Sequence, residues 1–260
     1  MRIHFLMIFL FSTLFFPLPA QAKLHTEVVE YKDGEVPLKG YLAYDEAVQD
    51  KRPAIIIVHD WKGEGPFVRE RAEQLAKMGY IAFAIDMYGK GVRPETTEDA
   101  ATQAGIYKGD RALMQRRARS AYELLRQHPL TDSSRMAAIG YCFGGTTVLE
   151  MARAGMDLLG VVSFHGGLST PNPEKTAGVK AKVLALHGAD DPYVPADEVK
   201  AFQEEMNKAK VDWQMVFYSH AVHSFTNPQA GNDNSKGAAY NEEAARWSWL
   251  AMQDFFKEIF

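Results

Sequence analysis

The hydrophobic pattern of the chain alternates between two periods. Residues 25–34 (HTEVVEYKDG) and 36–46 (VPLKGYLAYDE) alternate apolar and polar positions around an Asp-Gly pair, which predicts an N-terminal β-hairpin. Residues 53–61 (PAIIIVHDW) and 80–89 (YIAFAIDMYG) are nearly continuous apolar runs, typical of strands buried on both faces. Between them, residues 67–79 (FVRERAEQLAKMG) have helical apolar spacing and end on glycine, which predicts a helix.

The same alternation continues to the end of the chain. Further helices are predicted over residues 110–129, 145–155, 196–211 and 241–260, and further strands over residues 135–142, 158–167, 181–191 and 212–221. Strands that alternate with helices favour a mostly parallel sheet covered on both faces. Because no repeat or linker divides the chain, residues 23–260 are predicted to form a single α/β domain.

Residues 1–22 (MRIHFLMIFLFSTLFFPLPAQA) have a different character. A basic start, a short apolar run and the small-residue end Ala20-Gln21-Ala22 are the layout of a secretory signal peptide, with cleavage before Lys23. A membrane anchor is the alternative, but the apolar run over residues 5–16 is short for a bilayer. We therefore expect an exported protein, periplasmic or secreted, with no stable membrane insertion after cleavage.

Charge and cysteine content narrow the function. The formal net charge is −4 and the basic residues are dispersed among acids, so we expect no nucleic-acid partner. We also expect a monomer that acts on a small molecule. Cys142 is the single cysteine and cannot form an internal disulfide. A free thiol in an oxidising compartment points to a functional role.

Cys142 lies in a motif that suits a nucleophile. Gly140-x-Cys142-x-Gly144 matches the nucleophile elbow G-x-S-x-G with cysteine in place of serine, between a predicted strand and a predicted helix. The tight turn aims the side chain out of the sheet, and the backbone N–H groups of Phe143 and Trp61 are candidate oxyanion donors. The alternative is a close-packed glycine turn that holds an inert cysteine.

Two later segments supply the partners that such a nucleophile needs. An acid should follow a later strand and a histidine the last strand, and Asp191 and His223 occupy these places. Asp190 and His220 are the rival candidates. The Asp-Pro turn favours Asp191, and the position of His220 within or just after the strand makes it second to His223.

The chain resembles the dienelactone hydrolase family from about Ala54 to its end. The resemblance rests on GYCFGG (140–145), HGADDPYVP (187–195) and HSF (223–225), with the segment at residues 67–89. It implies an α/β-hydrolase fold, a nucleophile at Cys142, a general base and acid at His223, and an orienting carboxylate at Asp191, without a cofactor. It also implies that Asp60, where the family usually has glutamate, contacts the resting thiol, directly or, because its side chain is one methylene shorter, only through water, and helps to control its ionisation. The alternative is that Asp60 is an N-cap or an acid that orders its loop.

One departure from the family pattern concerns the substrate. Asn227 stands where family members that act on dienelactone have a carboxylate-binding arginine, so dienelactone is not the predicted substrate. The alternative is that Arg93 or Arg111 replaces this arginine, although both are equally well explained as solvated surface charges. Tyr88 and Tyr141 are expected to border the pocket together with Trp61 and Phe143, which suits a compact apolar or aromatic acyl group.

The predicted activity is hydrolysis of a carboxylic ester or lactone through a thioester acyl-enzyme. The alternative is a non-catalytic binding module on a hydrolase scaffold. A metal site built from His59, His165, His187 and Asp60 is not predicted, because no tight ligand spacing is present.

Overall fold

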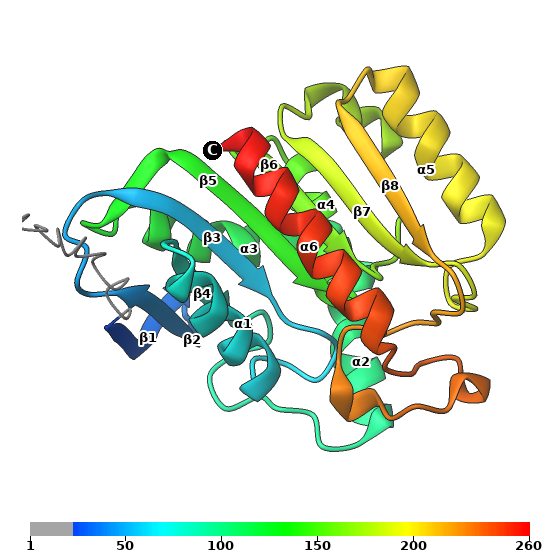
Figure 1. Ribbon diagram of the computed structural model, residues 1–260, viewed down its shortest axis with the longest axis horizontal. Helices are drawn as coiled ribbons and strands as arrows, with labels where there is room; N and C mark the ends of the chain where they lie inside the picture. Colours follow the sequence, from blue (N-terminus) through cyan, green and yellow to red (C-terminus); the bar gives the residue numbers. More distant parts are fainter. Residues whose placement is uncertain (1–22) are drawn as a thin grey trace, which may run out of the picture.

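An eight-stranded, mostly parallel sheet runs through the molecule (Figure 1). The computed structural model describes residues 23–260, so the predicted signal peptide lies outside the described residues. The strands are β1 (Leu24–Asp33), β2 (Val36–Asp45), β3 (Arg52–Val58), β4 (Ile81–Ile85), β5 (Thr131–Tyr141), β6 (Gly160–Phe164), β7 (Lys182–Gly188) and β8 (Trp213–Tyr218). Their order is β1-β2-β4-β3-β5-β6-β7-β8, and only the pairs β1–β2 and β2–β4 are antiparallel. The predicted parallel α/β architecture is confirmed.

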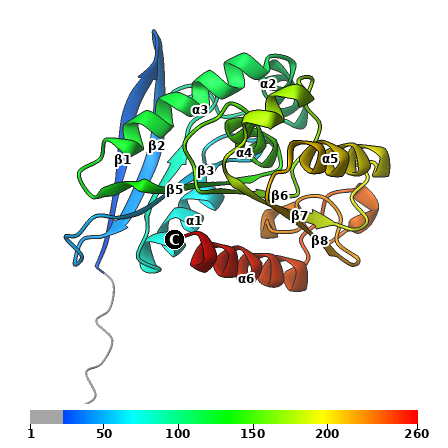
Figure 2. The same ribbon diagram turned by 90° about the horizontal axis from the view of Figure 1, so that it is seen from above.

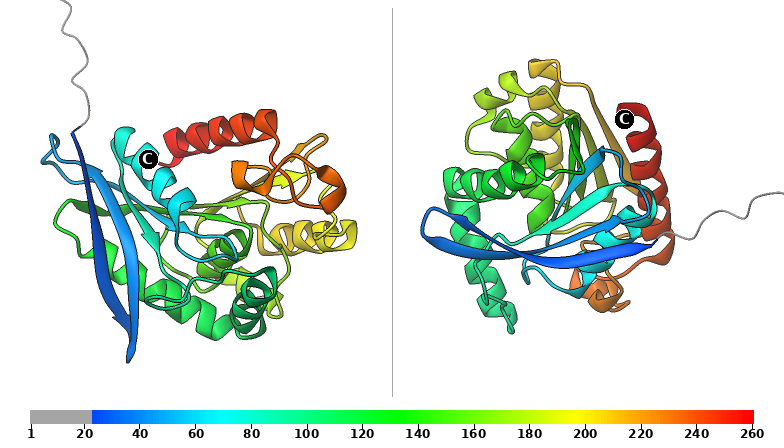
Figure 3. Two further views of the ribbon diagram at one scale, coloured as in Figure 1. Left: turned by 90° about the horizontal axis from the view of Figure 1, so that it is seen from below. Right: turned by 90° about the vertical axis from the view of Figure 1, so that its left-hand side faces the viewer.

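Helices cover both faces of this sheet. They are α1 (Pro66–Lys77), α2 (Thr97–Gly109), α3 (Arg111–Arg126), α4 (Phe143–Arg153), α5 (Ala196–Ala209) and α6 (Glu242–Ile259). Helices α1 and α6 lie on one face and α2 to α5 on the other (Figure 2). The β1–β2 hairpin lies at the opposite end of the sheet from α5 (Figure 3). Within residues 23–260, no helix is both long enough and apolar enough to cross a bilayer.

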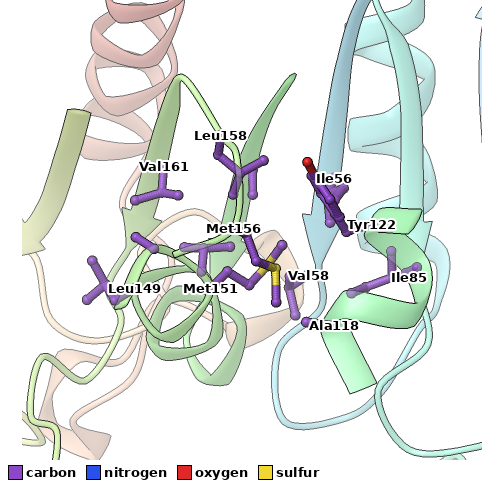
Figure 4. Close-up of a cluster of buried hydrophobic side chains, with 14 of the residues drawn as sticks. Ile56, Val58, Ile85, Ala118, Tyr122, Leu149, Met151, Met156, Leu158 and Val161 are labelled. Atoms are coloured by element: carbon purple, nitrogen blue, oxygen red, sulfur yellow. The ribbon is translucent and has the colours of Figure 1, made fainter. Parts of the chain in front are cut away.

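The continuous apolar run of β3 is divided between two cores. Successive side chains of a strand point to opposite faces, so Ile55 and Ile57 pack with α1 and α6, whereas Ile56 and Val58 pack with α3 and α4. Figure 4 shows Ile56 and Val58 in one buried cluster with Tyr122 and Ala118 of α3. A central strand flanked by helices on both faces needs apolar residues at every position, which is the pattern read from the sequence.

Helix α2 was not predicted from the sequence. Its local signal is an N-cap: the Thr96 side chain accepts a hydrogen bond from the Asp99 N–H. The buried side of the helix consists of Ala100, Ala104 and Tyr107, so small residues carry much of its packing and the amphipathic period is weak. This helix contributes Lys108 to the site described below.

The carboxyl ends of β3, β5, β6, β7 and β8 lie at one edge of the sheet because these strands are parallel. The loops that follow them carry Trp61, Cys142, His165, Asp191 and His223 in that order. This edge is where open α/β sheets place their ligands.

The crossing of β5 and α4 should depend on glycine. A Cβ atom at Gly140 would lie 2.0 Å from the carbonyl oxygen of Gly144, so we expect Gly140→Ala to lower the free energy of unfolding by about 3 kcal/mol or more. A Cβ at Gly105, inside α2, would meet nothing within 4 Å. Gly105→Ala should therefore raise stability by about 0.5–1 kcal/mol. Urea unfolding measures both, and a Gly140→Ala midpoint equal to that of the wild type would contradict the steric account.

Candidate active site

Cys142 occupies a strained corner between β5 and α4. Its backbone has φ 54° and ψ −112°, a region that residues with a Cβ atom rarely adopt. Gly144, two residues on, lets the first turn of α4 pass close to β3, because a Cβ there would lie 2.2 Å from the carbonyl oxygen of Val58. The helix therefore begins directly beneath the thiol.

Three side chains form a hydrogen-bonded row at this corner. His223 Nε2 lies 3.0 Å from Cys142 Sγ, and His223 Nδ1 lies 2.8 Å from Asp191 Oδ2. The other oxygen of Asp191 accepts the N–H of Tyr193 at 2.9 Å. The Asp191 carboxylate has no solvent exposure and the His223 ring is 12% exposed. Because Asp191 accepts at Nδ1, the Nε2 atom of the imidazole is directed at sulfur.

The rival residues lie elsewhere. Asp190 and His220 are exposed, and the carbonyl of His220 accepts hydrogen bonds from the side-chain amides of Asn234 and Asn241. His187 is buried at the end of β7, edge-on to Phe217. None of the three joins the row at the thiol.

The charge state of the row follows from its neighbours. Burial lowers the pKa of His223, but the negative charges of Cys142 and Asp191 and the hydrogen bonds to them raise it, with the net result that the pKa is raised to about 10. At neutral pH the imidazole is then protonated, and its Nε2 lies 3.0 Å from Cys142 Sγ. A cation beside a thiol favours the ionised form of the sulfur.

Two backbone N–H groups near the thiol have no hydrogen-bond acceptor within residues 23–260, those of Phe143 and Trp61. Phe143 is the first residue of α4, so its N–H has no acceptor within the helix. The N–H of Trp61, in the loop after β3, likewise has no hydrogen-bond acceptor within residues 23–260. Trp61 lines the same cavity as Cys142, and Phe143 follows Cys142 directly in the chain.

Two consecutive peptides around Trp61 are held by hydrogen bonds: the Asp60–Trp61 peptide, which carries the Trp61 N–H, by His59, and the Trp61–Lys62 peptide by Tyr88. His59 Nε2 accepts the N–H of Met87 at 3.2 Å, so the ring proton is on Nδ1 and is donated to the carbonyl of Asp60 at 2.5 Å. Tyr88 donates its hydroxyl to the carbonyl of Trp61 at 2.9 Å. Burial lowers the pKa of His59 and keeps the ring neutral. These contacts fix the direction of the Trp61 N–H.

Tyr88 and Tyr141 do not line the thiol cavity, which corrects the expectation from sequence. Tyr88 is 5% exposed and lies beneath the Trp61 loop. Tyr141 precedes Cys142 on β5, so the alternation of the strand turns it to the opposite face. There it stacks on Phe164 with ring centroids 4.7 Å apart.

Asp60 and Asn227 also lie away from the thiol. Asp60 Oδ1 accepts the N–H of Lys62 at 2.8 Å, and no hydrogen bond joins Asp60 to Cys142. Asn227 Oδ1 accepts the N–H of Gln229 at 3.0 Å and caps a short 3-10 helix. Both residues line a neighbouring hollow of about 390 Å³. The short carboxylate of Asp60 turns back on its own loop, which is the loop-ordering alternative, and forms no direct hydrogen bond to the thiol.

The thiol opens into a cavity of about 270 Å³. Its walls include three residues that sequence reasoning missed, Lys108 from α2 and Tyr193 and Val194 from the loop after β7. The Tyr193 ring lies edge-on to the His223 ring, with centroids 5.3 Å apart. The Asp-Pro-Tyr-Val-Pro turn was the available signal for these two loop residues, whereas Lys108 depends on the unpredicted helix.

A resident metal ion has no evident site in the described part of the chain. No group of three or more His, Cys, Asp or Glu side chains there is placed to hold one. Both ring nitrogens of His59 and of His165 are already hydrogen-bonded within the protein.

Comparison with known proteins identifies the family. The model of the dienelactone hydrolase family matches residues 38–260. The chain belongs to this family. It is an ester or lactone hydrolase, as the family description and the structural relatives indicate.

Three relatives show the extent of the similarity. A solved structure titled m3DLH is 38% identical, covers 91% of this chain and 99% of its own, and has a TM-score of 0.88. A dienelactone hydrolase-like promiscuous phosphotriesterase, P91, from metagenomic libraries is 39% identical over 91% of this chain and 99% of its own, with a TM-score of 0.86. A protein of Caenorhabditis elegans, K02A2.1, is 34% identical over 55% of this chain and 92% of its own length.

The hydrogen bond from Tyr88 to the Trp61 carbonyl should matter for turnover in this dienelactone hydrolase family member. Tyr88→Phe removes the hydroxyl that restrains the Trp61–Lys62 peptide, next to the peptide that carries the Trp61 N–H, and we expect kcat for p-nitrophenyl acetate to fall about tenfold with KM little changed. Tyr122→Phe is the matched control, because this buried tyrosine also donates to a backbone carbonyl, that of Asp157, but lies on α3. Equal kcat values for Tyr88→Phe and Tyr122→Phe would show that the Tyr88 hydroxyl has no such role.

Proposed function

We propose that this hydrolase cleaves a carboxylic ester or lactone with Cys142 as nucleophile, His223 as acid and base, and Asp191 as the group that orients the imidazole. The observation that carries the proposal is the contact of 3.0 Å between Cys142 Sγ and His223 Nε2, continued at 2.8 Å to Asp191. Nucleophile, base and orienting carboxylate within hydrogen-bond reach are the requirement for covalent acyl transfer.

In the first half of the reaction the thiolate attacks the carbonyl carbon and forms a C–S bond. The electron pair moves to the carbonyl oxygen, where the N–H groups of Phe143 and Trp61 stabilise the negative charge. Collapse of this intermediate breaks the C–O bond, and the His223 imidazolium gives its proton to the leaving oxygen. The products are an alcohol and a thioester on Cys142.

The second half uses the same histidine as a base. Forming the thioester removes the thiolate charge, which is one of the causes that raise the pKa of His223. The imidazole then remains neutral after losing its proton and accepts a proton from water that attacks the thioester. The intermediate expels the thiolate, the carboxylic acid leaves, and the ion pair with His223 is restored.

The cavity suits a compact acyl group. Its volume of about 270 Å³ and its walls of Trp61, Tyr193 and Val194 favour a small apolar or aromatic acyl chain. Asn227 lies in the neighbouring hollow and supplies no cation at the position of the family's arginine, and the cation on the wall of the thiol cavity is Lys108. We therefore propose small esters and lactones, not dienelactone, as the substrate class.

Substitution of Cys142 and of His223 tests their proposed roles as nucleophile and as acid and base. With residues 23–260, p-nitrophenyl acetate and γ-butyrolactone as substrates, Cys142→Ala should lower kcat about 10³-fold or more, because the nucleophile is lost. His223→Asn should do likewise. His220→Asn is the matched control, since His220 is exposed and lies three residues before His223.

Two results would contradict the proposed roles. Turnover by Cys142→Ala at the wild-type rate would remove the thiol from the mechanism. No turnover by the wild type across several acyl chains would favour a binding module.

Export is a second part of the proposal. We propose that residues 1–22 direct secretion and are removed before Lys23, on the basis of the Ala20-Gln21-Ala22 end. Expression of the full chain in a Gram-negative host, followed by fractionation and intact mass, should give a periplasmic protein that begins at Lys23. A protein that retains residues 1–22, in the membrane or the cytoplasm, would refute cleavage.

A further inference from the structure

His165 is a buried imidazole beside the thiol for which the mechanism above has no use. It follows β6, is 1% exposed, and contacts both halves of the site. The N–H of Cys142 points to its Nδ1 at 3.1 Å, and the hydroxyl of Thr226 lies 2.8 Å from its Nε2. A backbone N–H only donates, so Nδ1 is the acceptor, and the ring proton is on Nε2 and is donated to Thr226. The tautomer is therefore fixed.

The two hydrogen bonds of His165 connect two different loops. Cys142 is the nucleophile corner after β5, and Thr226 lies three residues after His223 on the loop that follows β8. The His165 ring also lies edge-on to the His223 ring, with centroids 5.3 Å apart. It therefore spans the gap across which the thiol and the base must meet.

The backbones of Cys142 and His165 are both in strained conformations that neighbouring contacts must hold. Cys142 has φ 54° and His165 has φ 41°, conformations that cost free energy for residues with a Cβ and persist where the surroundings determine them. The Cys142 N–H also donates to the carbonyl of Phe164 at 3.0 Å. His165 Nδ1 is thus the second acceptor of a three-centre hydrogen bond that ties the ends of β5 and β6 together.

His165 does not compete with His223 as a base. Burial and then the positive charge of His223 lower the pKa of His165 well below its usual value, so the ring stays neutral. Its one donor and one acceptor are already used. The contacts that connect the two loops therefore stay the same while His223 gains and loses its proton.

We propose that His165 is a positioning residue that connects Cys142 to the loop of His223 through Thr226 and so holds the thiol and the imidazole at reacting distance. This role rests on the proposed function, because it concerns the geometry of the same ion pair. A residue that only fills the core would affect stability, whereas a positioning residue also affects the reactivity of the thiol.

Thr226→Val tests the connection from the loop side. Valine keeps the shape of this 3% exposed side chain but removes the acceptor of His165 Nε2–H, and Thr226→Ser restores it. Thr176→Val is the matched control, a fully buried threonine whose hydroxyl donates to Glu205 far from the thiol along the chain. The readouts are the rate of Cys142 alkylation by iodoacetamide, followed by intact mass because the chain has one cysteine, and kcat and KM for p-nitrophenyl acetate.

We expect Thr226→Val to slow alkylation and to lower kcat, each about tenfold, with KM unchanged. Thr226→Ser should react within about twofold of the wild type, as expected for a retained hydroxyl. Thr176→Val should change only the melting temperature. The proposal would be overturned if Thr226→Val matched Thr176→Val both in the rate of Cys142 alkylation and in kcat.

His165→Asn breaks the same connection from the other end. Asparagine tolerates a positive φ, and its Oδ1 occupies the place of Nδ1, but its side chain does not extend to Thr226. We expect the same slowing as in Thr226→Val, and a double variant no slower than the slower single variant. Effects that multiply in the double variant would contradict a shared connection.

The two readouts separate this proposal from the proposed function. Slower alkylation in both variants, in a protein whose ester turnover does not depend on Cys142, would retain the positioning role and refute the proposed mechanism. Unchanged alkylation, in a protein whose turnover does depend on Cys142, would refute only the positioning role.

Discussion

Helix α4 begins within backbone contact of β3 and β5, and the rest of the site is arranged around that contact. A Cβ at Gly140 would lie 2.0 Å from the carbonyl of Gly144, and a Cβ at Gly144 would lie 2.2 Å from the carbonyl of Val58. Only hydrogen fits at either position. The close approach forces the turn between them into a positive φ at Cys142, which lifts the thiol above the sheet edge and places the N–H of Phe143 beneath it.

The electrostatics of the site depend on this placement. Thiol, imidazole and carboxylate lie in one row, so that the charges of Cys142 and Asp191 outweigh the burial of His223 and raise its pKa to about 10. The same interaction weakens once the sulfur is acylated. In the proposed mechanism a single histidine would therefore serve as an acid before the thioester forms and as a base after it.

The sequence predicted those parts of the molecule that depend on local order. Buried strands were visible as apolar runs, and Cys142, Asp191 and His223 each follow such a strand with a recognisable turn, so their convergence followed from the parallel sheet. Tyr141 was placed wrongly because the pocket was judged from proximity in sequence, whereas strand alternation turns alternate side chains to opposite faces. The orientation of the Asp60 side chain depends on which backbone N–H group its short carboxylate accepts, and the sequence does not show that this is the N–H of Lys62.

Other features depend on packing between distant segments. Helix α2 lacks a strong amphipathic period, so the sequence did not predict it. Lys108 of the cavity lies on this helix and was therefore not predicted either. His165 was considered only as a possible metal ligand, because nothing in the sequence shows that its two nitrogens meet Cys142 and Thr226. The role of a histidine near the nucleophile therefore depends on hydrogen-bond partners from loops that follow other strands, such as Cys142 and Thr226 for His165.

The most direct test of the account is to look for the acyl group on Cys142 itself. Residues 23–260 would be mixed with p-nitrophenyl trimethylacetate, whose bulky acyl group slows attack by water, quenched in acid at short times and examined by intact mass and peptide mapping. We predict a trimethylacetyl group on the peptide that contains Cys142, removable by neutral hydroxylamine and absent from Cys142→Ala. Release of p-nitrophenol by the wild type with no acyl group on Cys142 at any quench time would contradict the thioester mechanism.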